Sequence, residues 1–371
     1  RRGAADSSRE IDRVGGYLNA FTDRDSICRH CQVPASAWRL AIDVLADMAF
    51  ASRMDDVDFE KERDVIVSEI MSARDDPEEC SHDALLAAIW PGDPLSLKIA
   101  GEPEDLTRAT PGALRAFYRE RFVPSTLLAT VAGPVGAEEV AEALSESLER
   151  AAERSERTAL PAAIEATPIF VPAQTYRIAR MEQANYFEAV QLDPPYGEDD
   201  YYALAAVNGA IGEAASSRLF QSLRERRGLC YSVYSSFSLG RSECLWLASA
   251  NVSPSRVAEL ARAMGDEIDA VAAGELTDDE CADAITRLAG SFELSLDDPD
   301  FRMRRIARQI WFSGIALDEA ETRSRIAALD PLALRNMASR LLAGRPRARF
   351  AYGRRAAAAA KALSMEERRD G

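Results

Sequence analysis

Apolar positions along the first fifty residues repeat first at strand spacing and then at helix spacing. Tyr17 to Val33 has strand character, with a turn predicted at Thr22 to Asp25. From Ser36 to Phe50, apolar residues recur every three or four positions, which predicts a helix with one buried face. Gly15-Gly16 comes before the strands and predicts the end of an earlier helix, because glycine is favoured just past a helix terminus. The chain therefore opens as helix, hairpin, helix.

The same kind of pattern predicts further elements along the chain. A helix is predicted over Asp58 to Met71, and another begins at Thr110-Pro111, where a capping side chain precedes a proline in the first turn. Leu127 to Ala132 predicts a buried strand, followed by an amphipathic helix over Ala137 to Leu148. The second half shows strand character over Tyr176 to Leu192 and helical spacing over Asp199 to Ile211 and Ser217 to Arg226.

One order of elements occurs twice, which indicates two related halves. In each copy a glycine turn leads into strands, then into a helix that begins near a proline, then into a second helix. The second copy starts its last helix with Thr277 and Glu280, which predict a capping box. Between the copies, Ala151 to Gln174 is rich in alanine, charge and proline. We therefore predict two domains, residues 1–160 and 161–371.

Composition and charge exclude several classes of partner. The chain has 371 residues, of which 47% are hydrophobic and 29% charged, as in globular proteins of more than one domain. Its formal net charge of −16 argues against nucleic acid, whose binding requires a concentrated basic face. The longest apolar runs, Ala84 to Trp90 and Tyr201 to Val207, are far shorter than the roughly 18 residues of a membrane span. We expect a cytoplasmic location, with the periplasm as the alternative.

Cysteine and histidine are sparse, and one cluster invites a metal interpretation. Cys28-Arg29-His30-Cys31 offers three possible ligands, but a structural zinc site needs four and no second pair has suitable spacing. The stretch also has strand character, in which residues three apart point to opposite faces. His82 follows Cys80-Ser81 on a predicted helix and is interpreted as structural. A metal or redox module around Cys28 and Cys31 is the less favoured hypothesis.

Glu62 and Glu69 form the first candidate functional group. They lie seven residues apart on a predicted helix, which is two turns, so both carboxylates project from one face. Such a pair can bind a cation, although it is more often a solvated helix surface. In the second copy of the repeat, Ala282 and Ala289 stand at the corresponding positions. Only one half carries the acids, which points to a specific use for them.

Arg224 and Tyr231 form the second candidate group. Arg224 ends a predicted helix, Gly228 makes a turn, and Tyr231 opens a strand. A guanidinium and a phenol both donate hydrogen bonds and suit a carbonyl or a developing oxyanion. Periodicity alone favours the alternative, a basic helix end stabilised by the helix dipole and followed by an interior strand tyrosine.

Three segments together resemble the insulinase-type zinc peptidases, most closely the short bacterial branch related to the mitochondrial processing peptidase. The segments are Gly15 to Thr22, Glu62 to Ile70, and Ser216 to Phe220 with Arg227 to Val233, and they follow the family order across nearly the whole chain. The resemblance implies an α+β fold of two related halves, each a mixed β-sheet flanked by helices. It also implies a zinc-dependent endopeptidase that cleaves peptides inside a closed chamber, as a homodimer or a heterodimer with a related subunit.

The resemblance further implies roles for single residues. In this family an inverted H-x-x-E-H helix supplies two histidine ligands and a general-base glutamate. Glu69 matches the third zinc ligand, and Glu62 matches an acid that supports the site. Arg224 and Tyr231 match the pair that holds substrate near the scissile carbonyl. The edge strand that pairs with extended substrate corresponds to Asn19, Ala20, Phe21 and Thr22.

Two departures from the family pattern bear on activity. The sequence has no H-x-x-E-H, and its two histidines stand in other contexts. In the family this segment lies shortly before the helix that ends at Gly15-Gly16, so we expect it just upstream of Arg1, with the first half N-terminally incomplete. One ligand of three cannot hold catalytic zinc. Gly212-Glu213-Ala214-Ala215 also replaces a glycine-rich loop. A catalytically silent partner or scaffold subunit of the same fold is therefore the alternative.

Overall fold

The computed structural model describes residues 2–123, 126–152, 168–172, 174–179, 181–193, 196–240 and 244–354. These residues form an α+β fold, which confirms the predicted class. They divide into two compact units that exchange segments along the chain. The first unit comprises Arg1–Ser72, Lys98–Glu165 and Ser295–Trp311, and the second comprises Ala73–Leu97, Ala166–Leu294 and Phe312–Gly371. The predicted domain boundary at residues 160 and 161 lies outside the described residues and stays a prediction.

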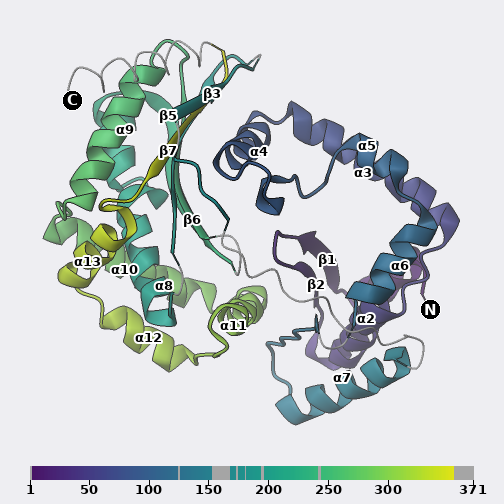
Figure 1. The fold of residues 1–371 in the computed structure, drawn as a ribbon. Helices are drawn as coiled ribbons and strands as arrows, with labels where there is room; N and C mark the ends of the chain where they lie inside the picture. The colour runs from purple at the N-terminus through teal and green to yellow at the C-terminus, as the bar shows by residue number, and fades with distance from the viewer. Residues whose placement is uncertain are drawn as a thin grey trace. The chain divides into compact units, whose positions relative to one another are not determined.

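The first unit contains a two-stranded hairpin and several helices (Figure 1). Helix α1 (Ala4–Asp12) is closed by a turn at Gly15, whose φ is +73°, as the glycine pair predicted. The antiparallel strands β1 (Tyr17–Thr22) and β2 (Ile27–Gln32) follow, which confirms the predicted hairpin. The remaining helices are α2 (Trp38–Phe50), most of α3 (Asp56–Asp75), α5 (Pro103–Arg108), α6 (Pro111–Arg121), α7 (Ala137–Ala152) and most of α11 (Pro299–Ser313).

Capping and apolar spacing explain where these helices form. Thr110 caps α6, because its hydroxyl accepts a hydrogen bond from the Ala113 N–H at 3.2 Å, and Pro111 takes the first helical position. Ala41 and Val44 on α2 are buried, and α2 packs against α7. The helices predicted from Ser36, Asp58, Thr110 and Ala137 are thus all present.

The strand predicted over Leu127 to Ala132 is wrong. Among the described residues, this stretch has no strand partner, and Leu127, Leu128 and Val131 are 39%, 37% and 42% exposed. An extended apolar run becomes a strand only when a neighbouring backbone satisfies its N–H and C=O groups. The only described sheet in this unit is the β1–β2 pair, which offers this run no partner.

The second unit is built on a five-stranded mixed sheet. Its strands run in the order β3 (Gln174–Arg177), β7 (Arg347–Tyr352), β4 (Ala184–Gln191), β6 (Cys244–Val252) and β5 (Cys230–Leu239). β3 pairs with β7 in parallel, and the other pairs are antiparallel. The helices of this unit are α4 (Pro77–Ile89), α8 (Glu198–Asn208), α9 (Val257–Ala272), α10 (Asp278–Ser295), α12 (Glu319–Ala327) and α13 (Pro331–Leu342).

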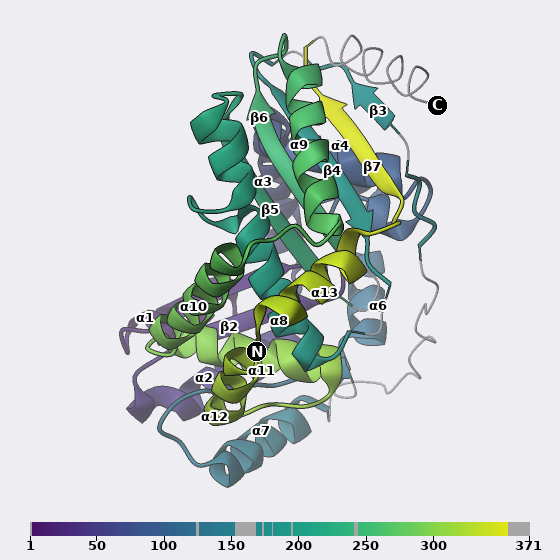
Figure 2. The same ribbon diagram turned by 90° about the vertical axis from the view of Figure 1, so that its left-hand side faces the viewer.

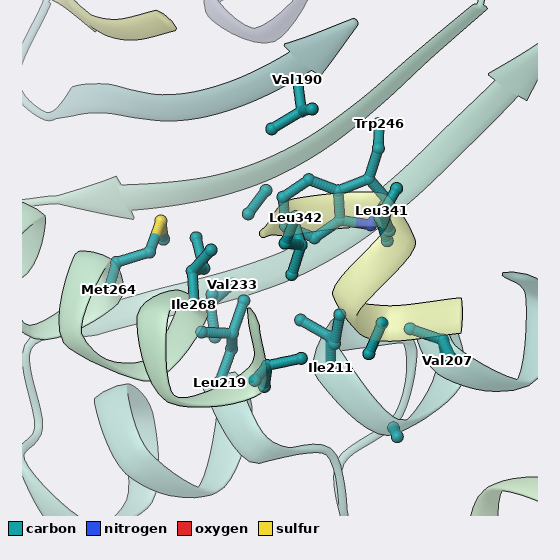
Figure 3. Packing of buried hydrophobic residues seen from close by; sticks show 14 of the residues in the cluster. Val190, Val207, Ile211, Leu219, Val233, Trp246, Met264, Ile268, Leu341 and Leu342 are labelled. Atoms are coloured by element: carbon teal, nitrogen blue, oxygen red, sulfur yellow. The ribbon is translucent and has the colours of Figure 1, made fainter. Parts of the chain in front are cut away.

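Both faces of this sheet are covered. Figure 2 shows α9 lying across the strands, and Figure 3 shows Trp246 packed among side chains from β4, α13 and the helical segments after α8. The opposite face is covered by α4 (Figure 1). Leu86 on α4 and Trp90 just after it pack with Phe187 and Leu247. The Trp90 indole N–H also donates to the side chain of Gln191 at 2.9 Å. The sheet is therefore a buried central layer.

The internal repeat is confirmed as an order of elements. The first copy is β1, β2, α2, α3, and the second is β5, β6, α9, α10. The capping box that opens α10 is present: the Glu280 N–H donates to the Thr277 hydroxyl at 3.1 Å, and the Thr277 N–H donates to the Glu280 carboxylate at 2.8 Å. None of the helices that the structure describes combines the length and apolarity needed to span a bilayer.

Candidate functional site

A helix-ending motif builds the turn between Arg224 and Tyr231. The helical segment Phe220–Arg226 widens to π geometry, which is frequent at functional sites. At its end the Gly228 N–H donates to the Arg224 carbonyl at 3.1 Å, and the Leu229 N–H donates to the Leu223 carbonyl at 2.8 Å. The bond from the Gly228 N–H to the carbonyl four residues earlier, with Gly228 at φ +56°, makes this an αL cap. The predicted turn at Gly228 is confirmed.

This turn brings Arg224 and Tyr231 together. The Arg224 guanidinium carbon lies 5.1 Å from the centre of the Tyr231 ring and 4.6 Å from the centre of the Phe220 ring. Both contacts are within cation–π range. Phe220 was not among the predicted site residues, although its position four residues before Arg224 on a helix is a usable signal. The guanidinium is thus oriented by two aromatic rings.

A β-bulge turns Tyr231 outward. Cys230 pairs with Val252 and Ser232 pairs with Asn251, so Tyr231 has no partner of its own on β6. Bulges of this kind re-aim a side chain at the end of a ladder. Tyr231 is 78% exposed as a result, which excludes the interior-tyrosine interpretation. Its phenol and the Arg224 guanidinium therefore present hydrogen-bond donors to solvent from one short segment.

The thiol beside Tyr231 is not suited to nucleophilic chemistry. Burial raises the pKa of Cys230 to about 11, against the smaller lowering effect of Arg224 and Arg256. The thiol therefore stays protonated at neutral pH, whereas a nucleophilic cysteine needs its thiolate form. This segment can bind and orient a carbonyl or an anionic oxygen.

Glu62 and Glu69 both lie on α3 with exposed side chains. Seven residues of helix separate them by about 10.5 Å along the axis, on one face. Val65, one turn after Glu62, is also exposed, at 49%. Neither carboxylate has a hydrogen bond or an ion pair with any residue that the structure describes. The predicted helix and the shared face are confirmed, and both acids are available to a ligand.

Glu69 has suitable donor chemistry for zinc but does not make a zinc site alone. A catalytic zinc takes three protein ligands, and no group of three histidine, cysteine or acidic side chains in the described residues could hold a metal ion. Cys28 and Cys31 lie three apart in β2, as the strand prediction expected. Burial raises the pKa of the Cys31 thiol to about 11, which disfavours the thiolate that a metal would need.

Asn19, Ala20, Phe21 and Thr22 lie in β1, and all four are exposed. β1 pairs with β2, and in the described structure it has no other strand beside it. It is therefore an edge strand in the described residues, whose free backbone groups could pair with an extended chain. Their role in substrate binding stays a prediction.

A cluster that the sequence did not reveal lies against this hairpin. The buried His30 ring lies about 6 Å from both the Tyr17 and Phe21 rings, at 6.1 and 6.2 Å. Its Nδ1 is 3.3 Å from Asp300 and its Nε2 is 3.2 Å from the Arg304 guanidinium, both on α11. Because Asp300 lies 270 residues from His30, no local pattern could have found this cluster.

Gly212 and Glu213 end a second π-helical stretch, Gly209–Glu213, which follows α8, and Ala214 and Ala215 come directly after it. A Cβ on Gly212 would lie 2.6 Å from the backbone nitrogen of Ser235 on β5, so only glycine fits there. Glu213 forms an ion pair with Arg287 at 3.1 Å. This part of the predicted loop is therefore packed on its neighbours.

Comparison with known proteins decides the family. The family model for insulinase, peptidase family M16, matches residues 1–103, and that for the peptidase M16 inactive domain matches residues 108–288. An uncharacterized zinc protease of Streptomyces coelicolor is 34% identical over 350 residues, covering 93% of this chain and 76% of that protein. The chain belongs to peptidase family M16. An uncharacterized zinc protease of Mycobacterium tuberculosis is 32% identical over 307 residues, which cover 83% of this chain and 70% of that protein.

Solved structures show the same fold as this M16 chain. A protease from Helicobacter pylori superposes with a TM-score of 0.80 at 15% identity, covering 95% of this chain and 85% of that one. A peptidase M16 inactive domain from Pseudomonas fluorescens superposes with a TM-score of 0.79 at 17% identity, and the match covers 95% of this chain and 84% of that one. The predicted family and its fold are thus confirmed.

Proposed function

We propose that this M16 chain is part of a zinc-dependent endopeptidase that cleaves peptides or unfolded segments inside a closed chamber. The proposal requires an H-x-x-E-H segment upstream of Arg1 in the full-length protein. The observation that carries it is the pair of the half-buried Arg224 and the exposed Tyr231, which is fixed by the αL cap at Gly228, a β-bulge and the Phe220 ring. Such preorganised donors suit a peptide carbonyl. The names of the relatives, zinc proteases, support the same class.

Each candidate residue has a defined task in this proposal. Bound zinc would activate a water molecule and polarise the scissile carbonyl. Glu69 would supply one ligand, and Glu62 would orient the site from the same face of α3. Arg224 and Tyr231 would donate hydrogen bonds to the substrate backbone. The exposed strand β1 would align the peptide by backbone pairing.

The test measures zinc content and peptide cleavage of the full-length protein. We expect Glu69→Gln to lose both bound zinc and cleavage, because an amide is a poor ligand for zinc and the charge is removed. We expect Glu62→Gln to reduce cleavage by about 10- to 100-fold while zinc is largely kept, as for residues that support a metal ligand. Glu60→Gln is the matched control: Glu60 is an exposed acid on the same helix that pairs with Arg63.

Three outcomes decide this test. Loss of zinc in Glu69→Gln alone supports the role of Glu69 as a ligand. One equivalent of zinc in Glu69→Gln would contradict that role. Full-length protein without H-x-x-E-H, and without cleavage, would contradict the enzyme as a whole.

A catalytically silent partner or scaffold subunit is the second candidate. The family model that covers residues 108–288, including Arg224 and Tyr231, is described as the inactive domain. A silent subunit would bind peptide through Arg224 and Tyr231 without zinc. Peptide binding without cleavage or zinc in the full-length protein would favour it. Cleavage that Glu69→Gln abolishes without loss of assembly would exclude it.

We further propose that the protein acts as a dimer, with a second copy or with a related M16 chain. M16 peptidases enclose their substrate between two such subunits, as the resemblance implies. Sedimentation of the purified full-length protein tests this: a single species of one-chain mass would contradict the homodimer. The cytoplasmic location stays a prediction, with the periplasm as its alternative.

A further inference from the structure

The segment that carries Arg224 begins at Arg218, which is tied to α10 by unusually complete hydrogen bonding. Arg218 Nε donates to Glu280 Oε1 at 2.8 Å, and Arg218 Nη2 donates to Glu280 Oε2 at 2.7 Å. Arg218 Nη2 also donates to the backbone carbonyl of Glu275 at 2.6 Å. The Arg218 side chain is only 12% exposed and that of Glu280 is 26% exposed. A paired guanidinium and carboxylate of this kind fix orientation as well as distance.

The position of Arg218 is unfavourable without this partner. It occupies the first residues of a helical segment, where the helix dipole repels a cation. The negative charge of Glu280 offsets this repulsion. Glu280 lies in the first turn of α10, where a carboxylate is favoured, and its carboxylate also accepts a hydrogen bond from the Thr277 N–H. The Glu280 carboxylate therefore links the start of the segment at Arg218 to the start of α10.

Other contacts hold the rest of the same segment and the turn after it. The hydroxyl of Ser222 donates to the Glu267 carboxylate on α9. Arg256 Nη1 donates to the Gly228 carbonyl at 2.7 Å, within the turn itself. Leu219 and Leu223 are fully buried beneath the segment. Arg218 is thus the anchor at the start of the segment, opposite the Gly228 turn at its end.

We propose that Arg218, held by Glu280, is a positioning residue that sets the orientation of Phe220 and Arg224 against Tyr231, and thereby the affinity for a peptide substrate. The inference rests on the proposed peptide-binding function of Arg224 and Tyr231. Neither Arg218 nor Glu280 touches the peptide. Their effect passes through the helical segment from Arg218 to Arg224.

The experiment compares Arg218→Ala, Arg218→Lys and Glu280→Gln in the full-length protein. The first readout is amide hydrogen exchange at Leu229, whose N–H bond to the Leu223 carbonyl reports the integrity of the Gly228 turn. We expect its exchange to rise in all three variants. Lysine keeps the charge but loses the guanidinium fork, so Arg218→Lys separates geometry from charge. Far-ultraviolet circular dichroism shows whether each variant is folded.

The second readout is binding of a fluorescein-labelled, unstructured peptide, measured by anisotropy in a Glu69→Gln background that prevents turnover. We expect Kd to rise by about tenfold in Arg218→Ala, the change expected when a charge-assisted donor is misplaced. The double variant Arg218→Ala, Glu280→Gln should bind the peptide no more weakly than Arg218→Ala alone, because both changes remove the same Arg218–Glu280 pair. Glutamine at position 280 can still accept the hydrogen bond from the Thr277 N–H.

Arg323 provides a matched control. It also forms a bidentate pair with a glutamate of α10, Glu293, at 2.6 and 3.0 Å. We expect Arg323→Ala to leave both Leu229 exchange and peptide affinity within twofold of the parent. An equal rise in exchange and Kd for Arg323→Ala would show a general loss of stability and would overturn the positioning role.

The remaining outcomes separate this inference from the proposed function. Unchanged exchange and Kd in Arg218→Ala would overturn the inference and leave the proposed function intact. Parent protein that does not bind peptide would overturn the proposed function, and with it the effect of Arg218 on affinity. Raised exchange with unchanged Kd would show that Arg218 has a structural role alone.

Discussion

Gly228 illustrates how much one residue decides at the candidate site. Its φ of +56° is strained for a residue with a side chain, yet a Cβ there would meet no atom within 4 Å. The cost of Gly228→Ala is therefore conformational and not steric. We expect the free energy of unfolding to fall by about 1 kcal/mol, the cost of a left-handed residue. Chemical denaturation of the two proteins measures it.

Gly290 gives the opposite control. It is exposed, lies within α10 and does not have a positive φ. A Cβ added at Gly290 would have no neighbouring atom within 4 Å. Alanine is a better helix former than glycine, so Gly290→Ala should stabilise the protein by about 0.5–1 kcal/mol. A stabilising effect of Gly228→Ala would show that the left-handed turn at Gly228 does not persist in solution.

The ionisation of Glu280 makes the stability of the same region depend on pH. Burial raises its pKa, but hydrogen bonds from Arg218 and Thr277 outweigh this and place the pKa below the ordinary value of 4.5. The unfolded state therefore binds the proton more tightly, and the stabilisation is complete above pH 4.5. It is lost as the pH falls through the folded-state pKa. We expect the stability difference between the parent and Glu280→Gln to shrink in acid, as measured by urea unfolding at several pH values. A difference that grows in acid would contradict this sign.

Local chemistry explains which residues were predictable. The Gly228 turn and the Thr277–Glu280 capping box could be predicted because each depends on residues within a few positions of one another. The contact of Phe220 with Arg224 follows the same logic. The outward turn of Tyr231 depends instead on the register of β5 against β6, which the sequence of β5 does not specify.

At the level of elements, helix α11 supports the edge strand β1. The Arg304 guanidinium lies 4.9 Å from the centre of the Phe21 ring and pairs with Asp300 at 2.6 Å. Its contact with His30 completes the cluster beneath the hairpin. We expect Arg304→Ala to lower the free energy of unfolding by about 1 kcal/mol, because a partly exposed cation–π contact and an ion pair are lost. Hydrogen exchange of β1 amides should rise in parallel.

Arg108 supplies the control for this change. It pairs with Asp105 three residues away at 2.5 Å, and both side chains are well exposed, so Arg108→Ala should alter stability by less than about 0.5 kcal/mol. If β1 exchange were equal in Arg304→Ala and the parent, the hairpin would not need α11 for its order.

Pairing between elements also explains why the strand predicted over Leu127 to Ala132 is absent from the described part of the chain. Leu127 to Ala132 has the composition of a buried strand, but strand formation needs a partner backbone, and the described residues offer none. The helices were predictable because each satisfies its own backbone. The predicted strand region Tyr176 to Leu192 holds β4 and the end of β3, separated by a break that apolar spacing alone did not show.

For the whole molecule, the decisive feature is that each compact unit contains a segment from the distant part of the chain. Residues 73–97 belong to the second unit, where α4 covers one face of the five-stranded sheet. Residues 295–311 belong to the first unit, with the β1–β2 hairpin. A repeat in sequence indicates related halves but does not show which helix covers which face. The two sequence halves therefore share an order of elements, but each compact unit contains residues from both halves.

This exchange leads to a prediction about residues 161–371 produced alone. Without α4, one face of the sheet would lose its cover and expose Phe187, Leu247 and Phe350. Each fully buried apolar side chain contributes about 1.5–3 kcal/mol, so exposing these three would cost about 4.5–9 kcal/mol. This loss is comparable with the whole stability of a typical domain, about 5–15 kcal/mol. We expect this fragment to bind the dye ANS and to unfold without a cooperative transition, as proteins with exposed apolar surface do. Fluorescence and thermal unfolding by circular dichroism measure both properties.

A peptide spanning residues 73–97 should restore the missing layer. Added to the fragment, it should lower ANS fluorescence and sharpen the unfolding transition, because α4 makes its buried contacts within this unit. The same peptide with Trp90→Ala is the matched control: it removes a side chain that is fully buried and that donates to Gln191. Cooperative unfolding of the fragment without any peptide would show that the sheet does not depend on α4. Equal rescue by both peptides would show that Trp90 does not direct the docking.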